Sequence, residues 1–479
     1  MREFLLQHAS KNPVSFHMPG HKGSAIFRKY GYGEFLENFA DCDVTEIPGA
    51  DNLFQAEGII MESQKKYAKL YDVKHSYLQI NGTSGGIIAS ILATVKPGRK
   101  LIMARNCHKS VFNALTLGNI QPVYAQPELI KEHGISGAIL PDEIKHCIEE
   151  NPQADAVILP SPNYYGICSD IKAIADVVHE AGKVLIVDQA HGAHLKFFHK
   201  FGCGEGMPMA AEDSGADIVI NSIHKTLASL TQSAVLNLNS DRVDRYVLED
   251  KLQAIESTSP SYILMSFLDI NADLLNEHGE EVMKNWRDNI AYFYEKAADI
   301  GGLKLMKAGN MDITKINLDM GALGIDGARL EQLLMERGIF SELYTGDILM
   351  LMTGIGNTRE HMERALEALA EIAGDAEVCK GSDGGSDGDS VGSGDRRKAH
   401  DIPAAGKLHD VPADKEFVAL EAAAGRICAG SIIPYPPGIP FVCPGEEITE
   451  DTVGYIRSLR AAGGKVIGVN DRGEVLVGK

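Results

Sequence analysis

The sequence predicts an α/β protein whose large domain is built on a mostly parallel sheet. From Gly58 onward, short apolar runs alternate with amphipathic stretches of helical length. The runs 155–159 and 183–187 follow the helical stretches 141–150 and 171–181, respectively. Apolar strands separated by helices are typical of parallel sheets covered on both faces. We also expect a smaller α/β domain and a C-terminal α+β module.

The chain of 479 residues exceeds the size of a single domain, and its hydrophobic fraction of 44% can form a substantial core. Pro13 and Pro19-Gly20 interrupt the first segment, which reads as an arm. Residues 380–395 contain Gly, Ser and Asp with almost nothing apolar, so burial cannot offset their ordering entropy. The predicted parts are an N-terminal arm (1–57), a large domain (58–262), a small α/β domain (263–376), a flexible linker (377–402) and a C-terminal domain (403–479).

An anion-binding turn is predicted after the first strand of the large domain. The helix 59–70 leads to the strand 76–80, and Asn81–Gly86 turns into the apolar helix 87–95. Small residues at a helix N-terminus leave backbone N–H groups for an anion, to which the helix dipole adds. Gly82, Thr83 and Ser84 would bind a phosphate, although a glycine turn alone does not identify a site.

Two strands end in groups that carry chemistry. The apolar run Lys183–Asp188 ends in a carboxylate, and the run 217–220 is followed by Asn221–Thr226, which contains Lys225. Ligands of open α/β sheets lie beyond the carboxyl ends of strands. Lys225 could form a Schiff base with an aldehyde cofactor such as pyridoxal 5′-phosphate, with Ser222 and His224 on its phosphate. Asp188 could keep the pyridine nitrogen protonated.

The alternatives are a solvated loop lysine and an aspartate that only caps a helix. The occurrence of both groups at strand ends favours the cofactor. The remaining expected elements are a strand (231–236), a helix (243–255), a long helix (264–300), a strand (312–318), a helix (327–337), a strand (349–352), a helix (359–372) and a hairpin turning at 470–473.

These stretches, with His17–Gly23, Asn81–Gly86 and Asn106–Ser110, resemble the ornithine/lysine/arginine decarboxylase family. Residues 421–427 and 434–440 resemble its C-terminal domain. The resemblance runs from about residue 10 to the C-terminus, interrupted near 377–402. It implies pyridoxal-phosphate dependence and the aspartate-aminotransferase (type I) fold. Larger members carry an additional receiver-like N-terminal domain, so we expect this chain to be a short form.

The resemblance also assigns site residues. His108 would stack on the cofactor ring, Asn163 would bond its phenolic oxygen, and His191 would join the cofactor-binding set. The segment 257–262 would reach the cofactor phosphate of a neighbouring subunit, so a homodimer or higher homo-oligomer is expected. His17, His21 and Lys22 invite a metal, but Pro and Gly separate the histidines and no Cys or acid is near, so no metal is predicted.

The predicted reaction is α-decarboxylation of a basic amino acid, with arginine as first choice and lysine or ornithine next. Lys225, Asp188 and His108 would be catalytic. An aminotransferase of the same fold is the nearest alternative, and Arg359 lies where such an enzyme could hold a substrate carboxylate. A non-catalytic regulatory relative is the other alternative, against which the intact Lys225 and Asp188 argue.

Bulk properties restrict the partners. The formal net charge of −20 disfavours nucleic acid and anionic membranes and suits a cationic substrate. The eight cysteines form no C-x-x-C pair, as expected of free thiols in a reducing compartment. Neither a signal peptide nor an apolar run long enough to span a membrane is evident, so a cytoplasmic location is expected.

Overall fold

The computed structural model describes residues 1–382, 406–435, 439–461 and 464–479, and its chain divides into two compact units. The first unit comprises Met1–Arg105, Ala114–Glu128 and Gly137–Ser386, and the second comprises Asn106–Asn113, Leu129–Ser136 and Asp387–Lys479.

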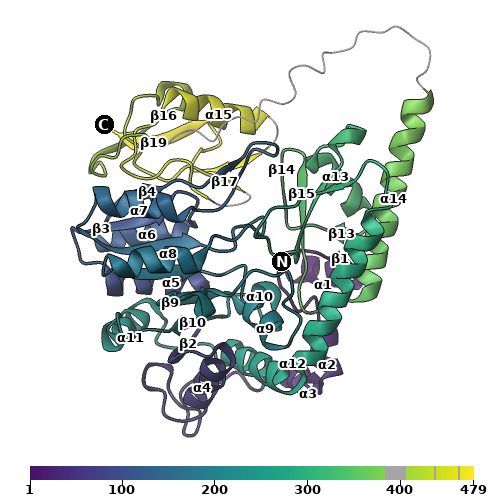
Figure 1. Ribbon diagram of the computed structural model, residues 1–479, viewed down its shortest axis with the longest axis horizontal. Coiled ribbons are helices and arrows are strands. Elements are labelled where there is room, and N and C mark those ends of the chain that lie inside the picture. The colour runs from purple at the N-terminus through teal and green to yellow at the C-terminus, as the bar shows by residue number, and fades with distance from the viewer. Residues whose placement is uncertain (383–405, 436–438, 462–463) are drawn as a thin grey trace. The chain divides into compact units, whose positions relative to one another are not determined.

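The first unit is built on a seven-stranded sheet with the order β2-β10-β9-β8-β7-β3-β4 (Figure 1). All neighbours are parallel except β10, which is antiparallel to both β2 and β9. The predicted mostly parallel sheet is therefore confirmed. Its strands are β2 (His75–Gln79), β3 (Lys100–Ala104), β4 (Gln121–Ala125), β7 (Ala154–Pro160), β8 (Val184–Asp188), β9 (Ile218–Asn221) and β10 (Ala234–Leu238).

Helices cover both faces of this sheet. On one face, Gly86 of α5 packs so closely that an added Cβ would lie 3.1 Å from Ile220 of β9. On the other face, Val235 of β10 shares a buried core with Tyr67 of α4 and with α12. These helices are α4 (Ile59–Tyr71), α5 (Gly82–Thr94) and α12 (Tyr262–Ala297).

Capping side chains fix where several helices begin. Asp170 accepts a hydrogen bond from the backbone N–H of Ala173 in α8, and Asp326 accepts one from Arg329 in α13. Pro141 occupies the first turn of α7, where no N–H is needed. The other helices of the first unit and those that reach it are α1 (Arg2–Ser10), α2 (Ala25–Lys29), α3 (Gly33–Asn38), α6 (Lys109–Gly118), α7 (Pro141–Glu150), α8 (Ile171–Glu180), α9 (Leu195–Lys200), α10 (Ile223–Thr226), α11 (Arg245–Ile255), α13 (Gly327–Glu336) and α14 (Arg359–Ser382).

The small domain has an antiparallel sheet with the order β11-β12-β15-β14. Its strands are β11 (Lys304–Leu305), β12 (Lys315–Asp319), β14 (Leu343–Thr345) and β15 (Ile348–Met352). Its core joins Phe293 of α12, Ile316 of β12, Leu349 of β15 and Leu369 of α14. The N-terminal arm is tied to this domain because β1 (Val14–Ser15) pairs in parallel with β13 (Ile339–Phe340).

Helix α14 continues to Ser382, and so enters the segment 377–402 that the sequence assigns to a linker. Each added helical residue gains a backbone hydrogen bond once a helix is nucleated, and α14 is anchored by its buried first turns. The rest of that predicted linker lies outside the described residues.

The second unit contains antiparallel strand pairs and a helix, with a core around Cys428, Ile448, Ile456 and Val475. Its elements are β5 (Leu129–Ile130), β6 (Ile135–Ser136), β16 (Lys415–Ala419), β17 (Ile433–Tyr435), α15 (Glu450–Ala461), β18 (Lys465–Ile467) and β19 (Glu474–Gly478). The expected turn at 470–473 is present, but the hairpin prediction was wrong in its pairing. β19 pairs with β16 and β18 with β17, while the turn itself is crossed by the isolated bridge Val469–Val475.

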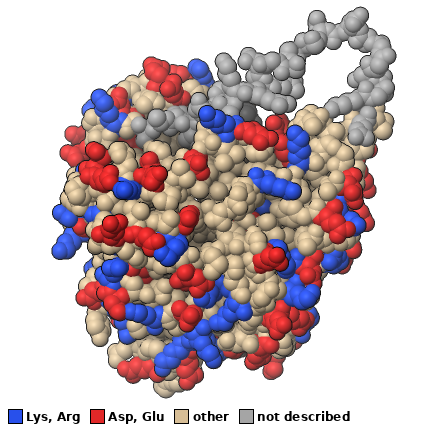
Figure 2. All heavy atoms as spheres, viewed as in Figure 1, with Lys and Arg blue, Asp and Glu red and all other residues tan. Residues whose placement is uncertain are grey.

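Figure 2 shows acidic and basic side chains intermixed over the visible face, in a chain whose formal net charge is −20. Of the helices in the described ranges, none combines the length and the apolar character needed to cross a bilayer. Free thiols are found at Cys42, Cys107, Cys147, Cys168, Cys203, Cys428 and Cys443.

Candidate active site

The candidate site lies at the edge of the large sheet where parallel strands end. β8 ends at Asp188 and β9 at Asn221, and these strands are adjacent and parallel. β7 ends at Pro160 beside Asp188. Loops that leave such neighbouring ends converge, which is why residues far apart in the sequence meet here.

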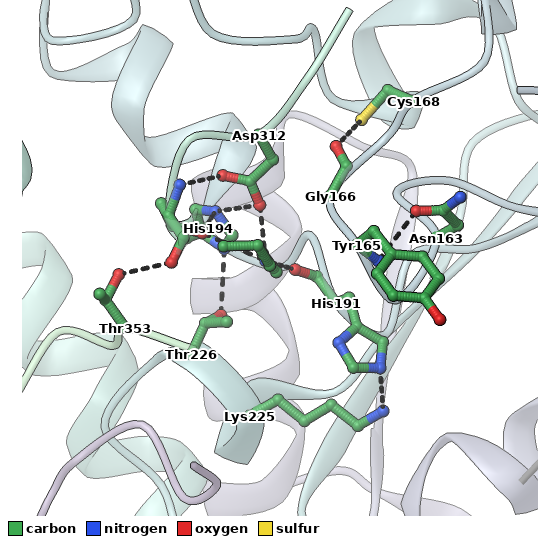
Figure 3. A network of polar contacts seen from close by, with 12 residues as sticks. Asn163, Tyr165, Gly166, Cys168, His191, His194, Lys225, Thr226, Asp312 and Thr353 are labelled. Atoms are coloured by element: carbon green, nitrogen blue, oxygen red, sulfur yellow. Dashed lines mark hydrogen bonds and ion pairs between the residues drawn. The ribbon is translucent and has the colours of Figure 1, made fainter. Parts of the chain in front are cut away.

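Lys225 lies in the short helix α10, directly after β9. Its Nζ is 2.9 Å from Nε2 of His191 (Figure 3). The same atom is 5.9 Å from the ring centroid of Tyr164. The rings of Tyr164 and His191 are 4.6 Å apart. Burial lowers the pKa of Lys225, whereas the carboxylates of Asp188 and Glu342 raise it. An amine with a lowered pKa is a better nucleophile near neutral pH.

Asp188 is only 6% exposed. One carboxylate oxygen, Oδ1, accepts a hydrogen bond of 3.1 Å from the N–H of Ala190. Within the described residues, the other oxygen accepts no hydrogen bond. Burial raises the pKa of Asp188, while the nearby Lys225 lowers it. A buried carboxylate with an uncommitted oxygen fits the protonated pyridine nitrogen of pyridoxal phosphate.

The N-terminus of α5 offers donors for a phosphate. The N–H of Gly82 donates to the carbonyl of Gln232 (2.8 Å), and Gly82 has a φ of 65°, which glycine adopts without strain. In the described part of the chain, the hydroxyls of Thr83 and Ser84 make no hydrogen bond to protein. They lie in the first turn of the helix, where the backbone N–H groups and the helix dipole favour an anion.

Ser222 and His224 lie close to this turn. Nδ1 of His224 donates to the carbonyl of Ser233 (2.9 Å). Ser233 directly follows Gln232, whose carbonyl accepts from Gly82. Burial lowers the pKa of His224 to about 4, so the ring is neutral near pH 7. Ser222 is buried, with Oγ 3.4 Å from Nδ1 of His224. The donor set therefore fits a cofactor phosphate shared by α5 and α10.

Asn163 closes the turn that follows β7. Its Oδ1 accepts the N–H groups of Tyr165 and Ile167, each at 3.0 Å, and its Nδ2 donates to Gly137 at 3.4 Å. Its amide is thus already used to shape the turn, and its contact with the cofactor's phenolic oxygen stays a prediction. His108 belongs to the second unit, where its Nδ1 is 2.9 Å from Oγ of Ser110. Its stacking role also stays a prediction.

The segment His17–Gly23 braces the lysine from the same chain. The N–H of Gly20 donates to the carbonyl of His224 (2.7 Å), and the carbonyl of Gly20 accepts from Gly356 (3.0 Å). A Cβ on Gly20 would lie 2.4 Å from the carbonyl carbon of Thr226. Lys22 donates to backbone carbonyls, including that of Met352 at 3.1 Å, and burial lowers its pKa to about 7.

Two acids of the site were not found from the sequence. Glu342, between β13 and β14, accepts the N–H of Met18 (3.0 Å), and its charge acts on Lys225. Glu212 is buried and accepts side-chain amide bonds from Gln189, Asn221 and Asn237 at 2.7–2.9 Å. Glu212 thus joins the residue after Asp188 to the end of β9. Neither acid belongs to a local motif.

Arg359 is engaged away from Lys225. Its guanidinium stacks on the ring of Tyr292 at 3.8 Å and reaches the carbonyl of Asp288 (3.4 Å). This arrangement favours a helix-anchoring role over the carboxylate-binding role that an aminotransferase would need.

Comparisons with known proteins agree with this geometry. A model of the Orn/Lys/Arg decarboxylase major domain matches residues 1–316, and one of the C-terminal domain of the same family matches residues 397–472. An arginine decarboxylase of Bacillus subtilis (strain 168) is 33% identical, over 98% of this chain and 94% of the relative.

Two solved structures have the same fold at 20% sequence identity. Constitutive lysine decarboxylase of Escherichia coli superposes with a TM-score of 0.72, over 96% of this chain and 79% of the other. Lysine decarboxylase A of Pseudomonas aeruginosa gives 0.75, over 99% and 80%. The predicted type I fold of pyridoxal-phosphate enzymes is confirmed.

Proposed function

Since the chain belongs to the Orn/Lys/Arg decarboxylase family, we propose that it converts a basic amino acid into its amine and CO2, with arginine as the preferred substrate. Pyridoxal phosphate would be held by Lys225. The observation that carries the proposal is the placement of two groups at the ends of adjacent strands. Lys225, whose pKa is lowered, follows β9, and the buried carboxylate of Asp188 ends β8.

Bound pyridoxal phosphate supplies an aldehyde for the substrate amine and a ring that accepts the electron pair released as CO2 leaves. Asp188 would hold the proton on the ring nitrogen through its uncommitted oxygen. Thr83, Ser84, Ser222 and His224 would bind the phosphate. Lys225 and His191 share a hydrogen bond, so a proton can pass between them and be delivered to the substrate carbon.

Glu342 supports a cationic substrate. Its charge reaches Lys225, and it is anchored through Oε2 to the backbone of the arm, which leaves its other oxygen for a ligand. A carboxylate held in place is a suitable partner for a guanidinium or ammonium group. The curated relative of B. subtilis, named arginine decarboxylase, supports arginine over lysine and ornithine.

Product analysis tests the proposal. The purified protein loaded with pyridoxal phosphate is incubated separately with arginine, lysine and ornithine, and amines are identified by mass spectrometry. Agmatine from arginine, at the highest kcat/KM of the three, is expected. No amine from any of them would refute decarboxylation of a basic amino acid, and a keto acid would point to amino transfer.

Glu342→Gln tests the acid that sequence reasoning missed. The variant is expected to raise KM for the preferred substrate by about tenfold, as one charge-assisted contact is lost, with a smaller effect on kcat. Glu336→Gln, at an exposed site in α13, is the matched control. Equal KM values in the two variants would remove Glu342 from substrate recognition.

A further inference from the structure

A buried ion pair lies behind the candidate site. Asp312 and Lys315 are both inaccessible to solvent, and Oδ2 of Asp312 is 2.5 Å from Nζ of Lys315. The same oxygen is 3.1 Å from Nε2 of His194, which is also fully buried. Figure 3 shows dashed contacts meeting at Asp312 and His194. Lys315 is the first residue of β12, and His194 lies in the loop between β8 and α9.

Protonation in this cluster follows from its contacts. Burial would raise the pKa of Asp312, but the charge of Lys315 and the hydrogen bonds from Lys315 and His194 outweigh it and hold that pKa well below its usual range. Burial lowers the pKa of His194. A neutral ring with its proton on Nε2 donates to Asp312 and leaves Nδ1 to accept from the hydroxyl of Thr226, 3.1 Å away.

The cluster contacts His191 and Thr226, the second of which directly follows Lys225. Nζ of Lys315 also donates to the backbone carbonyl of His191, whose side chain contacts Lys225. His194 contacts Thr226, the residue after Lys225. The third donor of Lys315 is directed at the hydroxyl of Thr314 (3.2 Å), so all three of its protons have acceptors.

Stability alone is a poor reason for such a pair. Removing two charges from water costs several kcal/mol per ion, and well-packed apolar residues of similar volume are often as stable. Here the pair fixes Lys315 as a donor to the backbone carbonyl of His191. It also fixes His194, whose Nδ1 accepts from the hydroxyl of Thr226. Preorganisation of this kind limits the movement of the lysine and its neighbour.

We propose that Asp312, Lys315 and His194 are positioning residues. They hold the side chains of His191 and Lys225 in the relative positions that cofactor binding requires. This inference rests on the proposed role of Lys225 in holding pyridoxal phosphate. None of the three is a catalytic residue, because they contact the site through the backbone of His191 and the hydroxyl of Thr226.

A double-mutant cycle on cofactor affinity tests the inference. Lys315→Met, His191→Ala and the double variant are titrated with pyridoxal phosphate, and Kd is read from the visible absorbance of the bound cofactor. Lys315→Met is expected to raise Kd about tenfold in the wild-type background and at most about threefold in His191→Ala, because its effect passes through His191. Melting temperatures are measured alongside.

Lys196→Met is the matched control. Lys196 is another largely buried lysine, paired with Asp213 in the same unit, and its removal should lower the melting temperature without changing Kd. Thr226→Val removes only the hydroxyl contact with His194 and preserves side-chain shape and the ion pair. Thr226→Val is expected to raise the Kd for pyridoxal phosphate several-fold. If Lys315→Met does not fold, the Kd of Thr226→Val alone tests the inference.

Equal effects of Lys315→Met in both backgrounds would overturn the inference, as would an unchanged Kd in Thr226→Val. If the wild-type chain takes up cofactor but forms no amine, the proposed function fails while this inference stands on its Kd values. If the wild-type chain takes up no cofactor, both fail.

Discussion

The Nζ atom of Lys225 lies 2.9 Å from Nε2 of His191, which brings the loop after β9 into contact with the loop after β8. The contact requires one of the two nitrogens to be unprotonated. Burial lowers the pKa of Lys225 and so favours the neutral amine.

Replacement of Lys225 by Ala should abolish both the visible absorbance of bound pyridoxal phosphate and turnover, because no other residue would hold the aldehyde. Absorbance spectra and amine production are the measurements. Lys172→Ala, at a side chain that is 66% exposed, is the control and should behave as wild type. A wild-type spectrum in Lys225→Ala would assign the cofactor to another residue.

Replacement of Asp188 by Asn retains shape but removes the charge that keeps the ring nitrogen protonated. We expect the cofactor to bind and kcat to fall by about 100- to 1,000-fold, the loss seen when preorganised electrostatic groups are removed. Kd from absorbance titration and kcat from amine release separate the two effects. Turnover within a few-fold of wild type would refute this role.

The sheet and the strand-end residues were predictable because their signals are local. An apolar run followed by Asp188, and another followed by Ser222–Lys225, can be read in windows of ten residues. Glu342 and the pair Asp312–Lys315 could not be found in this way. Their roles depend on the packing of the small domain against the loops after β8 and β9, which no local pattern specifies.

The structure differs from the sequence-based expectation in one strand pairing, and α14 extends past the expected start of the linker. The sequence near 470 gives a turn, but which strands pair is decided by the core around Val475, and β19 pairs with β16. The linker composition begins after residue 380, whereas α14 continues to Ser382. Composition describes average preference, while a helix already anchored continues until its hydrogen bonds are lost.

Because His224 is neutral in the folded chain, we expect the free energy of unfolding to depend on pH in the acid range. Its pKa is about 4 in the folded chain against 6.5 for an unperturbed histidine, so between these values the unfolded chain binds the additional proton. Stability therefore falls as pH drops from about 6.5 to 4, by about 3 kcal/mol from this residue. Urea unfolding of the cofactor-free protein measures it.

His224→Gln should be less sensitive over the same interval. Because other histidines also titrate there, the relevant quantity is the difference in slope between wild type and variant. Parallel curves for the two proteins would show that His224 does not contribute.

Gly20→Ala should disrupt the lysine segment from a distance in sequence. The new Cβ would lie 2.4 Å from the carbonyl carbon of Thr226, so the backbone next to Lys225 must move. We expect a loss of 1–3 kcal/mol in unfolding free energy, typical of overpacking, and a raised Kd for cofactor. Gly309→Ala, where a Cβ meets open space, is the control.

The predicted homodimer can be tested by complementation. Residues 257–259 are exposed in the single chain, as expected of a loop that completes a partner's phosphate site. Lys225→Ala and a Ser257→Ala/Ser259→Ala chain should each be impaired, and mixing them should restore activity because one hybrid site receives intact parts from both. Subunit exchange is verified by mass; exchange without recovery would reject the shared site.

The contacts of Gly20 have a consequence for biosynthesis. The arm is made first, but β1 pairs with β13 around residue 339, and Gly20 is bonded to both His224 and Gly356. Contacts this distant in sequence cannot form until the later partner has left the ribosome. The hydrogen bond between Gly20 and Gly356 can therefore form only after Gly356 emerges, so the contacts around the Lys225 segment are completed late in synthesis.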